Sequence, residues 1–354
     1  MERRQFLQIA ASGATIGSLS GCSTLASLIP KREEEIRPMR TGVSCICHHN
    51  PKHIQMDLEE MKSLQLDDLF VCAQENDFVN FVGKVEYVPK MARNMGIRPI
   101  LTIYGLLNLF GGGRTSHILL DFPEGFQVAK DGSHRAQGCY VDPVCVKRVK
   151  RLLDIGAANG FEGYYIDEPT PQRDCYCKSC RTKFGDIHGG DLAEADDDLV
   201  EEFRIRCLMD FMSETTTHWK ELMPDTETMA CIMPHDKGLW PVAAKIETLD
   251  NIGTNIYLCN RKKYDVEMMT PLVRELAEVC RAHGKRHHEW LQNCGVRAGR
   301  EDRVVDQGDI LIREQPDGLY VWAWHGQVGV AGERCENPEL AWKKAAQVLR
   351  KAKG

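Results

Sequence analysis

The chain has 354 residues, of which 43% are hydrophobic and 27% are charged, and this is the balance of an ordinary globular protein. The composition excludes a disordered or collagen-like chain, and a formal net charge of -6 leaves no basic surface of the kind that nucleic-acid-binding domains use. The length fits a barrel of alternating strands and helices. Fifteen cysteines are too few for a small disulfide scaffold, so their spacing has to explain them.

The first 21 residues carry the features of an export signal. Arg3 and Arg4 precede an apolar stretch over residues 9–19, which is too short to span a bilayer, since a span needs about 20 residues. The Arg-Arg-x-Phe-Leu pattern resembles a twin-arginine signal, and the Leu-Ser-Gly-Cys sequence that ends at Cys22 resembles the lipobox of bacterial lipoproteins. The alternative is an ordinary amphipathic N-terminal helix.

These resemblances imply a protein that is exported and anchored to a membrane. We expect residues 1–21 to be removed, Cys22 to be acylated and residues 22–40 to form a polar tether. The lipid bilayer is then a partner, and the protein lies in the periplasm or at the cell surface. Residues 41–354 remain as one globular domain. Twin-arginine signals carry folded proteins, so free thiols and metal sites can be assembled in the cytoplasm before export.

From residue 41 onward, short apolar runs alternate with amphipathic stretches of helical period, which is the pattern of a parallel sheet with crossover helices. The third helix, for example, has Pro143 at its first position and Gly160 after its last. Strands are expected, in chain order, at 41–48, 68–74, 97–104, 163–167, 228–233, 253–259, 286–290 and 318–324. Helices are expected at 53–64, 84–94, 143–159, 199–222, 241–248, 271–283, 303–313 and 338–349.

Eight strands and eight helices in one series predict an α/β protein with a single-domain (β/α)8 TIM barrel. A doubly wound open sheet is the alternative, but that fold usually has a Gly-rich turn after its first strand. Here the sequence after the first strand is Cys47-His48-His49-Asn50-Pro51, without a glycine. No Gly-rich motif of the phosphate-binding kind opens a predicted helix, so we expect no organic cofactor.

Polar and aromatic residues gather where the predicted strands end, and in a TIM barrel these ends carry the functional residues. Carboxylates, amides and histidines hydrogen-bond hydroxyl groups, and indole rings pack against the C–H faces of sugars. The pattern therefore predicts a carbohydrate ligand. The candidate substrate-binding residues are His48, His49, Glu75, Tyr104, His235, Tyr257, His288, Trp290, Trp322 and Trp324.

Two glutamates stand at strand ends that face each other across an eight-stranded barrel. Glu168 follows the fourth strand, and Glu289 lies at the end of the seventh. Glycoside hydrolysis needs two carboxyl groups, one to donate a proton and one to act as nucleophile or to activate water. The sequence therefore predicts that Glu168 and Glu289 form a catalytic pair, with Glu75 in reserve.

The stretch Tyr164-Tyr165-Ile166-Asp167-Glu168-Pro169 resembles the strand-four motif of clan A glycoside hydrolases, in which Asn-Glu-Pro carries the acid/base. The resemblance implies that Glu168 is the acid/base, Glu289 the nucleophile and Trp324 the floor of a sugar subsite. Asp167 departs from the clan, which usually has asparagine there. The same stretch resembles fucosidase-like barrels and hypothetical glycosyl hydrolase-like families, which implies Asp167 as the nucleophile. Both assignments stay open.

A dense cysteine string follows the fourth strand. Cys175, Cys177 and Cys180 are too close in sequence to form unstrained disulfides with one another. Three thiolates at one point suit a tetrahedral Zn²⁺ ion, and Cys139 is the best fourth ligand, with Cys145 as a fallback. The set resembles the zinc cluster of family 42 β-galactosidases, which implies a structural zinc that braces two long loops. Reduced buried thiols or one disulfide are the alternatives.

The sequence supports three hypotheses about function. The first is a glycoside hydrolase that acts on a glycan or oligosaccharide by a two-carboxylate mechanism. The second is a carbohydrate-binding surface lipoprotein without catalysis. The third is a metal-dependent hydrolase or isomerase that uses the histidines at the strand ends.

Overall fold

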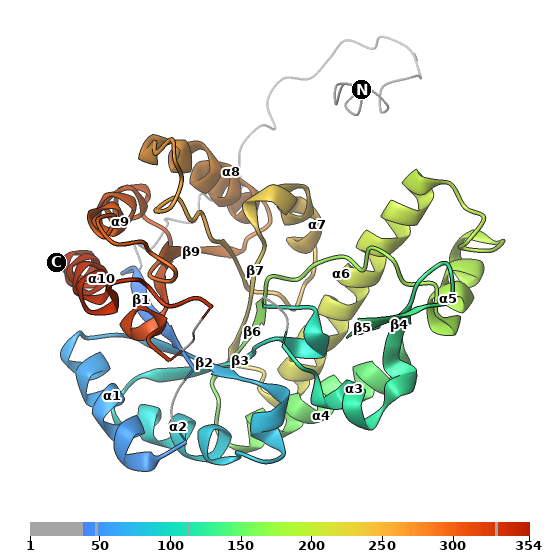
Figure 1. The fold of residues 1–354 in the computed structure, drawn as a ribbon, viewed down its shortest axis with the longest axis horizontal. Coiled ribbons are helices and arrows are strands. Elements are labelled where there is room, and N and C mark those ends of the chain that lie inside the picture. Colours follow the sequence, from blue (N-terminus) through green and yellow to red (C-terminus); the bar gives the residue numbers. More distant parts are fainter. Residues whose placement is uncertain (1–37, 47–48, 112–113, 330–331) are drawn as a thin grey trace, which may run out of the picture. The chain divides into compact units, whose positions relative to one another are not determined.

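The computed structural model describes residues 38–46, 49–111, 114–329 and 332–354. Eight parallel strands form a closed barrel in the order β1-β10-β9-β8-β7-β6-β3-β2 (Figure 1). The predicted single-domain (β/α)8 barrel is therefore confirmed. The predicted signal, Cys22, His48 and most of the predicted tether lie outside the described residues. The barrel strands are β1 (Arg40–Cys45), β2 (Asp68–Ala73), β3 (Arg98–Ile103), β6 (Gly163–Asp167), β7 (Glu227–Cys231), β8 (Asn251–Thr254), β9 (Arg286–Gln292) and β10 (Gly318–Trp322).

Helices surround the barrel and lie at its rim. The α-helices are α1 (Pro51–Ser63), α2 (Gly83–Asn94), α3 (His117–Asp121), α4 (Pro143–Ala158), α5 (Lys178–His188), α6 (Asp197–Leu222), α7 (Trp240–Ala243), α8 (Met269–Ala282), α9 (Asp302–Glu314) and α10 (Pro338–Lys353). Short 3-10 turns are η1 (Glu75–Phe78), η2 (Leu106–Asn108), η3 (Pro123–Gly125), η4 (Pro234–Leu239), η5 (Val266–Met268) and η6 (Trp324–Gln327). Among the described residues, no helix is long and apolar enough to cross a bilayer.

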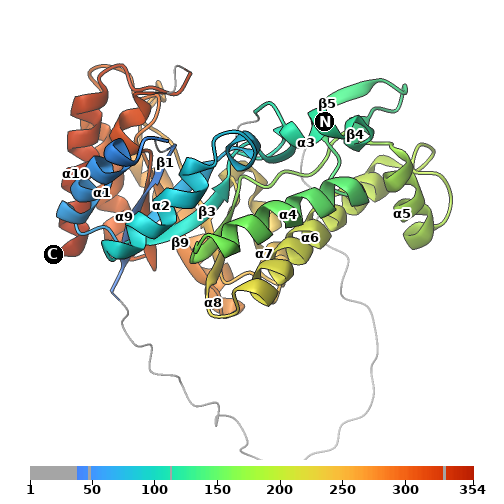
Figure 2. The same cartoon turned by 90° about the horizontal axis from the view of Figure 1, so that it is seen from below.

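Helix α4 shows how local sequence sets an element. The Asp142 side chain accepts a hydrogen bond from the Val144 amide at the helix start, and Pro143 occupies the first turn. Val149 and Leu153 are fully buried on the face toward the barrel. Figure 2 shows α4 beside α6, and the two helices are in contact.

Three parts of the chain differ most from the prediction. The helix expected at 241–248 is shorter, since α7 ends at Ala243. The sixth strand ends at Thr254, not at Cys259, because only Asn251 to Thr254 pair with a neighbouring strand. The alternating apolar residues after Thr254 continue into a buried loop above the barrel. The loops beside the fourth strand also contain a hairpin, β4 (Phe126–Val128) with β5 (His134–Gly138), and helix α5, at one end of α6 (Figure 2).

Buried ion pairs close the barrel at the end where its strands begin. Asp68 accepts hydrogen bonds from Arg40 (Nη2–Oδ1 2.5 Å) and Arg98 (Nε–Oδ1 2.7 Å), and Glu227 pairs with Arg98 and Arg286 at 2.8 Å each. Burial alone would raise the pKa of Asp68, but the hydrogen bond from Arg40 and the charge of Arg98 outweigh burial and lower it. The end of the barrel where the strands begin therefore contributes to stability. A functional site is expected at the opposite end, where the strands finish.

Aromatic side chains fill the middle of the barrel. The ring of Phe70 contacts Tyr165, Trp290 and Tyr320 at centroid distances of 5.1, 4.8 and 4.6 Å. These four side chains are at most 2% exposed. The barrel interior is therefore a packed core, and space opens only above this layer.

Candidate active site

A cavity of about 150 Å³ opens at the end of the barrel where the strands finish. Its lining comes from the ends of β3, β6, β7, β8, β9 and β10 and from the loops that follow, as expected for a TIM-barrel site. Three carboxyl groups, several aromatic rings and two thiols share it. The lining residues are Tyr104, Gly111, Tyr165, Asp167, Glu168, Cys231, Asn255, Tyr257, Trp290, Cys294, Trp322 and Glu333.

Glu168 enters the cavity from the turn after β6. Its backbone is left-handed, with a φ of 45°, a conformation that costs a non-glycine residue roughly 1–3 kcal/mol and is often found at functional sites. Asn255 donates a hydrogen bond from Nδ2 to Glu168 Oε1 at 2.8 Å. Burial raises the pKa of Glu168, partly opposed by this hydrogen bond, and the nearby Glu333 raises it further. A raised pKa suits a carboxyl group that donates a proton near neutral pH.

Asp167, the last residue of β6, points into the barrel and is 8% exposed. Burial raises its pKa well above the ordinary value, and the charges of Glu168 and Glu333 add to the rise. Gly111 lies against it, because a Cβ atom at Gly111 would stand 2.6 Å from Asp167 Oδ2, and its φ is 60°. Glycine at this position therefore allows the loop after β3 to close over Asp167.

Glu333 is the third carboxyl group, from the loop between β10 and α10. Tyr104 donates from Oη to Glu333 Oε1 at 3.0 Å, and Arg114 donates from Nη2 to the same oxygen at 2.9 Å. Arg114 also donates to Tyr104 Oη at 2.7 Å. Sequence reasoning missed Glu333, since no strand end or motif marks it. The only signal is that it follows the eighth strand, on the loop side of the barrel.

Aromatic residues form much of the cavity wall, as the sequence predicted for Tyr104, Tyr257, Trp290 and Trp322. Within the described part of the chain, the Trp290 Nε1 and Asn255 Oδ1 atoms are buried and have no hydrogen-bond partner. Because buried polar groups are nearly always paired, these two atoms mark positions where a polar ligand can bind.

The structure does not bring Glu289 to this cavity. Glu289 is fully buried, and its neighbours His288 and Trp290 face the barrel interior, so strand alternation directs Glu289 outward. Among the described residues neither carboxyl oxygen has a hydrogen-bond partner. Burial raises the pKa of Glu289 well above its ordinary value.

Other expected binding residues do not line the cavity. Glu75 is 3% exposed and accepts hydrogen bonds from the Leu107 amide (2.7 Å), the Ser116 hydroxyl (2.6 Å) and the Ile118 amide (2.8 Å). It therefore anchors the loop after β3. His288 is fully buried in the layer below the cavity, where Nδ1 bonds Asn251 Oδ1 at 2.8 Å.

Three further candidates lie at or beyond the rim. His49 is exposed, and its ring contacts the ring of Phe81 in a tilted arrangement at a centroid distance of 5.1 Å. His235 is also exposed, yet close enough for its charge to act on Glu168. Trp324 lines a separate cavity of about 290 Å³ and donates from Nε1 to Asp57 Oδ1 at 3.1 Å. The aromatic residue of the eighth strand that lines the Glu168 cavity is Trp322.

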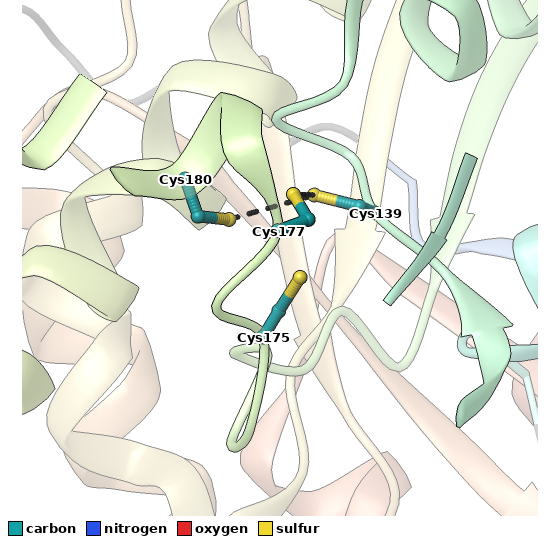
Figure 3. A group of neighbouring side chains, drawn as sticks. All are labelled: Cys139, Cys175, Cys177 and Cys180. Carbon is teal, nitrogen blue, oxygen red and sulfur yellow. Dashed lines mark hydrogen bonds between the residues drawn. The ribbon is translucent and has the colours of Figure 1, made fainter. Parts of the chain in front are cut away.

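Four cysteines form a second cluster, near the β4–β5 hairpin and α5. The ligand atoms of Cys139, Cys175, Cys177 and Cys180 all lie within 4.8 Å of one another, and Figure 3 shows their side chains converging. Cys139 Sγ is 3.6 Å from the Sγ atoms of Cys177 and Cys180. None of the four is in a disulfide. Cys145 lies outside the group, with its Sγ 3.5 Å from the Gly125 carbonyl oxygen.

The spacing and chemistry of this cluster fit a tetrahedral metal ion. Bonds of about 2.3 Å to a central Zn²⁺ place the sulfur atoms about 3.8 Å apart, close to the distances between Cys139 and two of its neighbours. Four cysteine side chains are also the ligand set of a closed, structural zinc site. Within the described ranges no histidine joins a group of three or more metal-binding side chains.

Comparison with known proteins identifies the architecture. No known protein family and no curated protein sequence matches the chain. Among solved structures, a catalytic mutant of a GH42 β-galactosidase from G. stearothermophilus superposes with a TM-score of 0.68 at 13% identity, over 89% of this chain and 56% of that chain. A β-galactosidase from Halorubrum lacusprofundi superposes with a TM-score of 0.66 at 13% identity, over 89% of this chain and 58% of that chain.

In other solved structures with this fold, the aligned region covers a larger share of the protein to which this chain is compared. The endo-β-1,4-mannanase from Thermotoga petrophila gives a TM-score of 0.54 at 13% identity, over 90% of this chain and 77% of that chain. By contrast, this chain spans a little over half the length of the β-galactosidases. At these identities the likeness concerns the fold. The chain has the closed barrel fold found in GH42 β-galactosidases and in a GH5_18 protein from Streptomyces cattleya, which superposes with a TM-score of 0.58 at 13% identity.

Proposed function

We propose that the protein is a glycoside hydrolase and that Glu168 is its proton donor. The observation that supports this most is the convergence of Glu168, Asp167 and Glu333 in one aromatic-lined cavity at the functional end of the barrel. Glycoside hydrolysis needs a protonated carboxyl group and a second carboxylate across the scissile bond. The barrel fold shared with glycoside hydrolases agrees with this proposal.

Each group at Glu168 has a role in this reaction. The raised pKa of Glu168 favours its protonated form, which can transfer a proton to the glycosidic oxygen. Asn255 fixes the carboxyl group through Oε1, which leaves the other oxygen for the substrate. Trp290 and Trp322 provide ring faces for a sugar, and the Trp290 Nε1 atom provides a donor for a hydroxyl group.

The size of the cavity suggests which part of a glycan enters. About 150 Å³ is below the range of roughly 300–1,000 Å³ that drug-sized ligands need. We therefore propose that one terminal sugar unit occupies the cavity and that the enzyme removes sugars from chain ends.

A panel of chromogenic monosaccharide glycosides tests the proposal. The wild type should hydrolyse at least one of them, and Glu168→Gln should lower kcat by about 10²–10⁴-fold because the proton donor is lost. Glu162→Gln is the matched control, since Glu162 pairs with Arg93 beside the start of the same strand and should not affect turnover. Equal activity of the wild type and Glu168→Gln would remove Glu168 from the mechanism.

The placement of Glu289 favours a second candidate function. Because Glu289 does not reach the cavity, the pair expected from the clan A resemblance is missing there. A barrel without that pair can bind a sugar without cleaving it. Calorimetric titration with the same sugars separates the two functions, since a binding protein gives heat of binding and no released product.

We also propose that Cys139, Cys175, Cys177 and Cys180 hold a structural zinc ion. The convergence of four buried thiols supports this, and a site with four cysteine ligands has no open position for catalysis. Elemental analysis should find one zinc per chain, and Cys177→Ser should lose it and lower the melting temperature. Cys207→Ser, a buried cysteine of α6 outside the cluster, is the control. Zinc that stays bound in Cys177→Ser would contradict the assignment.

The membrane anchor is a further proposal, supported by the lipobox-like sequence at Cys22. In cells fed labelled palmitate, the full chain should take up label and fractionate with membranes. Cys22→Ser should do neither. Label that persists in Cys22→Ser would contradict acylation at this residue.

A further inference from the structure

We propose that Glu333, from the loop after the eighth strand, is the catalytic nucleophile. This inference rests on the proposed hydrolase function and assigns its second carboxylate. The contacts of Glu333, the burial of its two acidic neighbours and the side chains of β9 all support it.

The contacts of Glu333 fix the position of its carboxyl group. Arg114 and Tyr104 both donate to Oε1, at 2.9 and 3.0 Å, and Gln327 donates from Nε2 to Oε2 at 3.5 Å. The hydrogen bond from a guanidinium is charge-assisted and directional, so it orients the group strongly. The two short hydrogen bonds to Oε1 orient the carboxyl group. Oε2 has only the long contact with Gln327 and is the oxygen that can attack the substrate.

The loop that carries Arg114 is itself fixed. Glu75 anchors its backbone at Leu107 and Ile118. Gly105 makes room for the arginine, because a Cβ atom at Gly105 would stand 2.6 Å from Arg114 Cβ. The cation that orients Glu333 is therefore built into the fold.

Asp167 is less suited to attack a sugar. It is buried at the end of β6, and burial together with Glu168 and Glu333 raises its pKa well above the ordinary value. A protonated carboxyl group is a poor nucleophile. Of the three acids in the cavity, Glu168 and Asp167 have a raised pKa because they are buried, whereas Glu333 has the Arg114 guanidinium 2.9 Å from its Oε1.

The seventh strand offers no acid to the cavity. Its inward positions are held by His288, Trp290 and Gln292, and Glu289 faces the helices. A second carboxylate for the cavity therefore has to come from another element. Glu333 is the cavity-lining acid outside the Asp167-Glu168 pair.

The chemistry is a double displacement. Glu333 Oε2 forms a bond to the anomeric carbon while the glycosidic C–O bond breaks and its oxygen takes the proton of Glu168. Water then attacks the anomeric carbon, releases Glu333 as a carboxylate and returns its proton to Glu168. No oxidant, reductant or cofactor is required.

The test compares four variants, Glu333→Gln, Glu333→Ala, Glu168→Gln and Glu289→Gln, on an aryl glycoside that the wild type hydrolyses. Glu333→Gln should lower kcat by about 10³-fold or more, because the nucleophile is lost. Glu289→Gln is the matched control and should retain wild-type activity, since Glu289 is buried on the side of β9 that faces away from the cavity. Circular dichroism and melting temperature confirm that each variant is folded.

Azide rescue separates a nucleophile from a structural residue. In Glu333→Ala, added azide should fill the vacated space, restore release of the phenol and yield a glycosyl azide of inverted anomeric configuration. A structural role would give no such product. Loss of activity in Glu168→Gln with wild-type activity in Glu333→Gln overturns this inference and leaves the hydrolase function in place. A loss in Glu333→Ala that azide does not rescue also overturns it. A wild type that hydrolyses none of the glycosides overturns the proposed function itself.

Discussion

Replacing Asn255 with alanine should extend activity to higher pH. Asn255 stabilises the charged form of Glu168 by a 2.8 Å hydrogen bond and so lowers its pKa, against burial and the charge of Glu333, which raise it. His235 also lowers it and is unchanged in the variant. A hydrogen bond to a charged group contributes about 1.5–3 kcal/mol, and one pKa unit corresponds to 1.36 kcal/mol. The pKa of Glu168 should therefore rise in Asn255→Ala, because the hydrogen bond that opposes burial is lost.

The sign of the effect follows from the role of Glu168. The proton donor works in its protonated form, so activity is lost as the pH rises through its pKa. The basic limb of the profile of kcat/KM against pH should shift upward in Asn255→Ala, even if the maximum rate falls. Asn80→Ala, at an exposed asparagine that donates to Asn76, should leave the limb in place. An unshifted or lowered limb in Asn255→Ala would refute the reasoning.

Three further variants test the parts of the fold that support the site. Gly111→Ala should lower turnover strongly, because its Cβ would stand 2.6 Å from Asp167 Oδ2 at a positive φ; steady-state kinetics measure this, and wild-type turnover would contradict the close contact. Glu75→Gln should lower the free energy of unfolding by about 1–3 kcal/mol, because the side-chain NH2 group of glutamine would face backbone N–H groups that need an acceptor. An unchanged urea midpoint would exclude the anchoring role. Asp68→Asn should lower the free energy of unfolding by about 3 kcal/mol, since Arg40 and Arg98 lose the buried counter-charge that they contact. The pKa of Asp68 is lower in the folded protein than in the unfolded chain. The stabilisation by Asp68 is therefore present above the pKa of the unfolded chain and is lost as the pH falls through the pKa of the folded protein. In urea titrations at acid pH, the difference in stability between wild type and Asp68→Asn should shrink.

The alternation of strands and helices was sufficient to predict the barrel. Caps such as Asp142-Pro143 placed α4 correctly, because they act on their own helix. The sixth strand was misplaced because the apolar run after Thr254 keeps the period of a strand although it pairs with no neighbour. Period alone does not show whether a partner strand is present.

The site was predictable where a residue ends a strand. Glu168 follows a clear strand, and so its place in the cavity could be inferred from the sequence. Glu289 could not be assigned to a face, because both faces of a parallel barrel strand are buried and the apolar pattern does not distinguish them. Glu333 depends on long-range contacts with Arg114 and Tyr104, and such contacts leave no local pattern.

The most direct test of the central claim is the dependence of hydrolysis on the leaving group in Glu168→Gln. A lost proton donor matters most when the departing phenol is weakly acidic, because such a phenol leaves only with a proton. Rates for a series of aryl glycosides should therefore fall steeply with rising phenol pKa in Glu168→Gln, and only weakly in the wild type. An equal loss of rate for every phenol would contradict Glu168 as the proton donor.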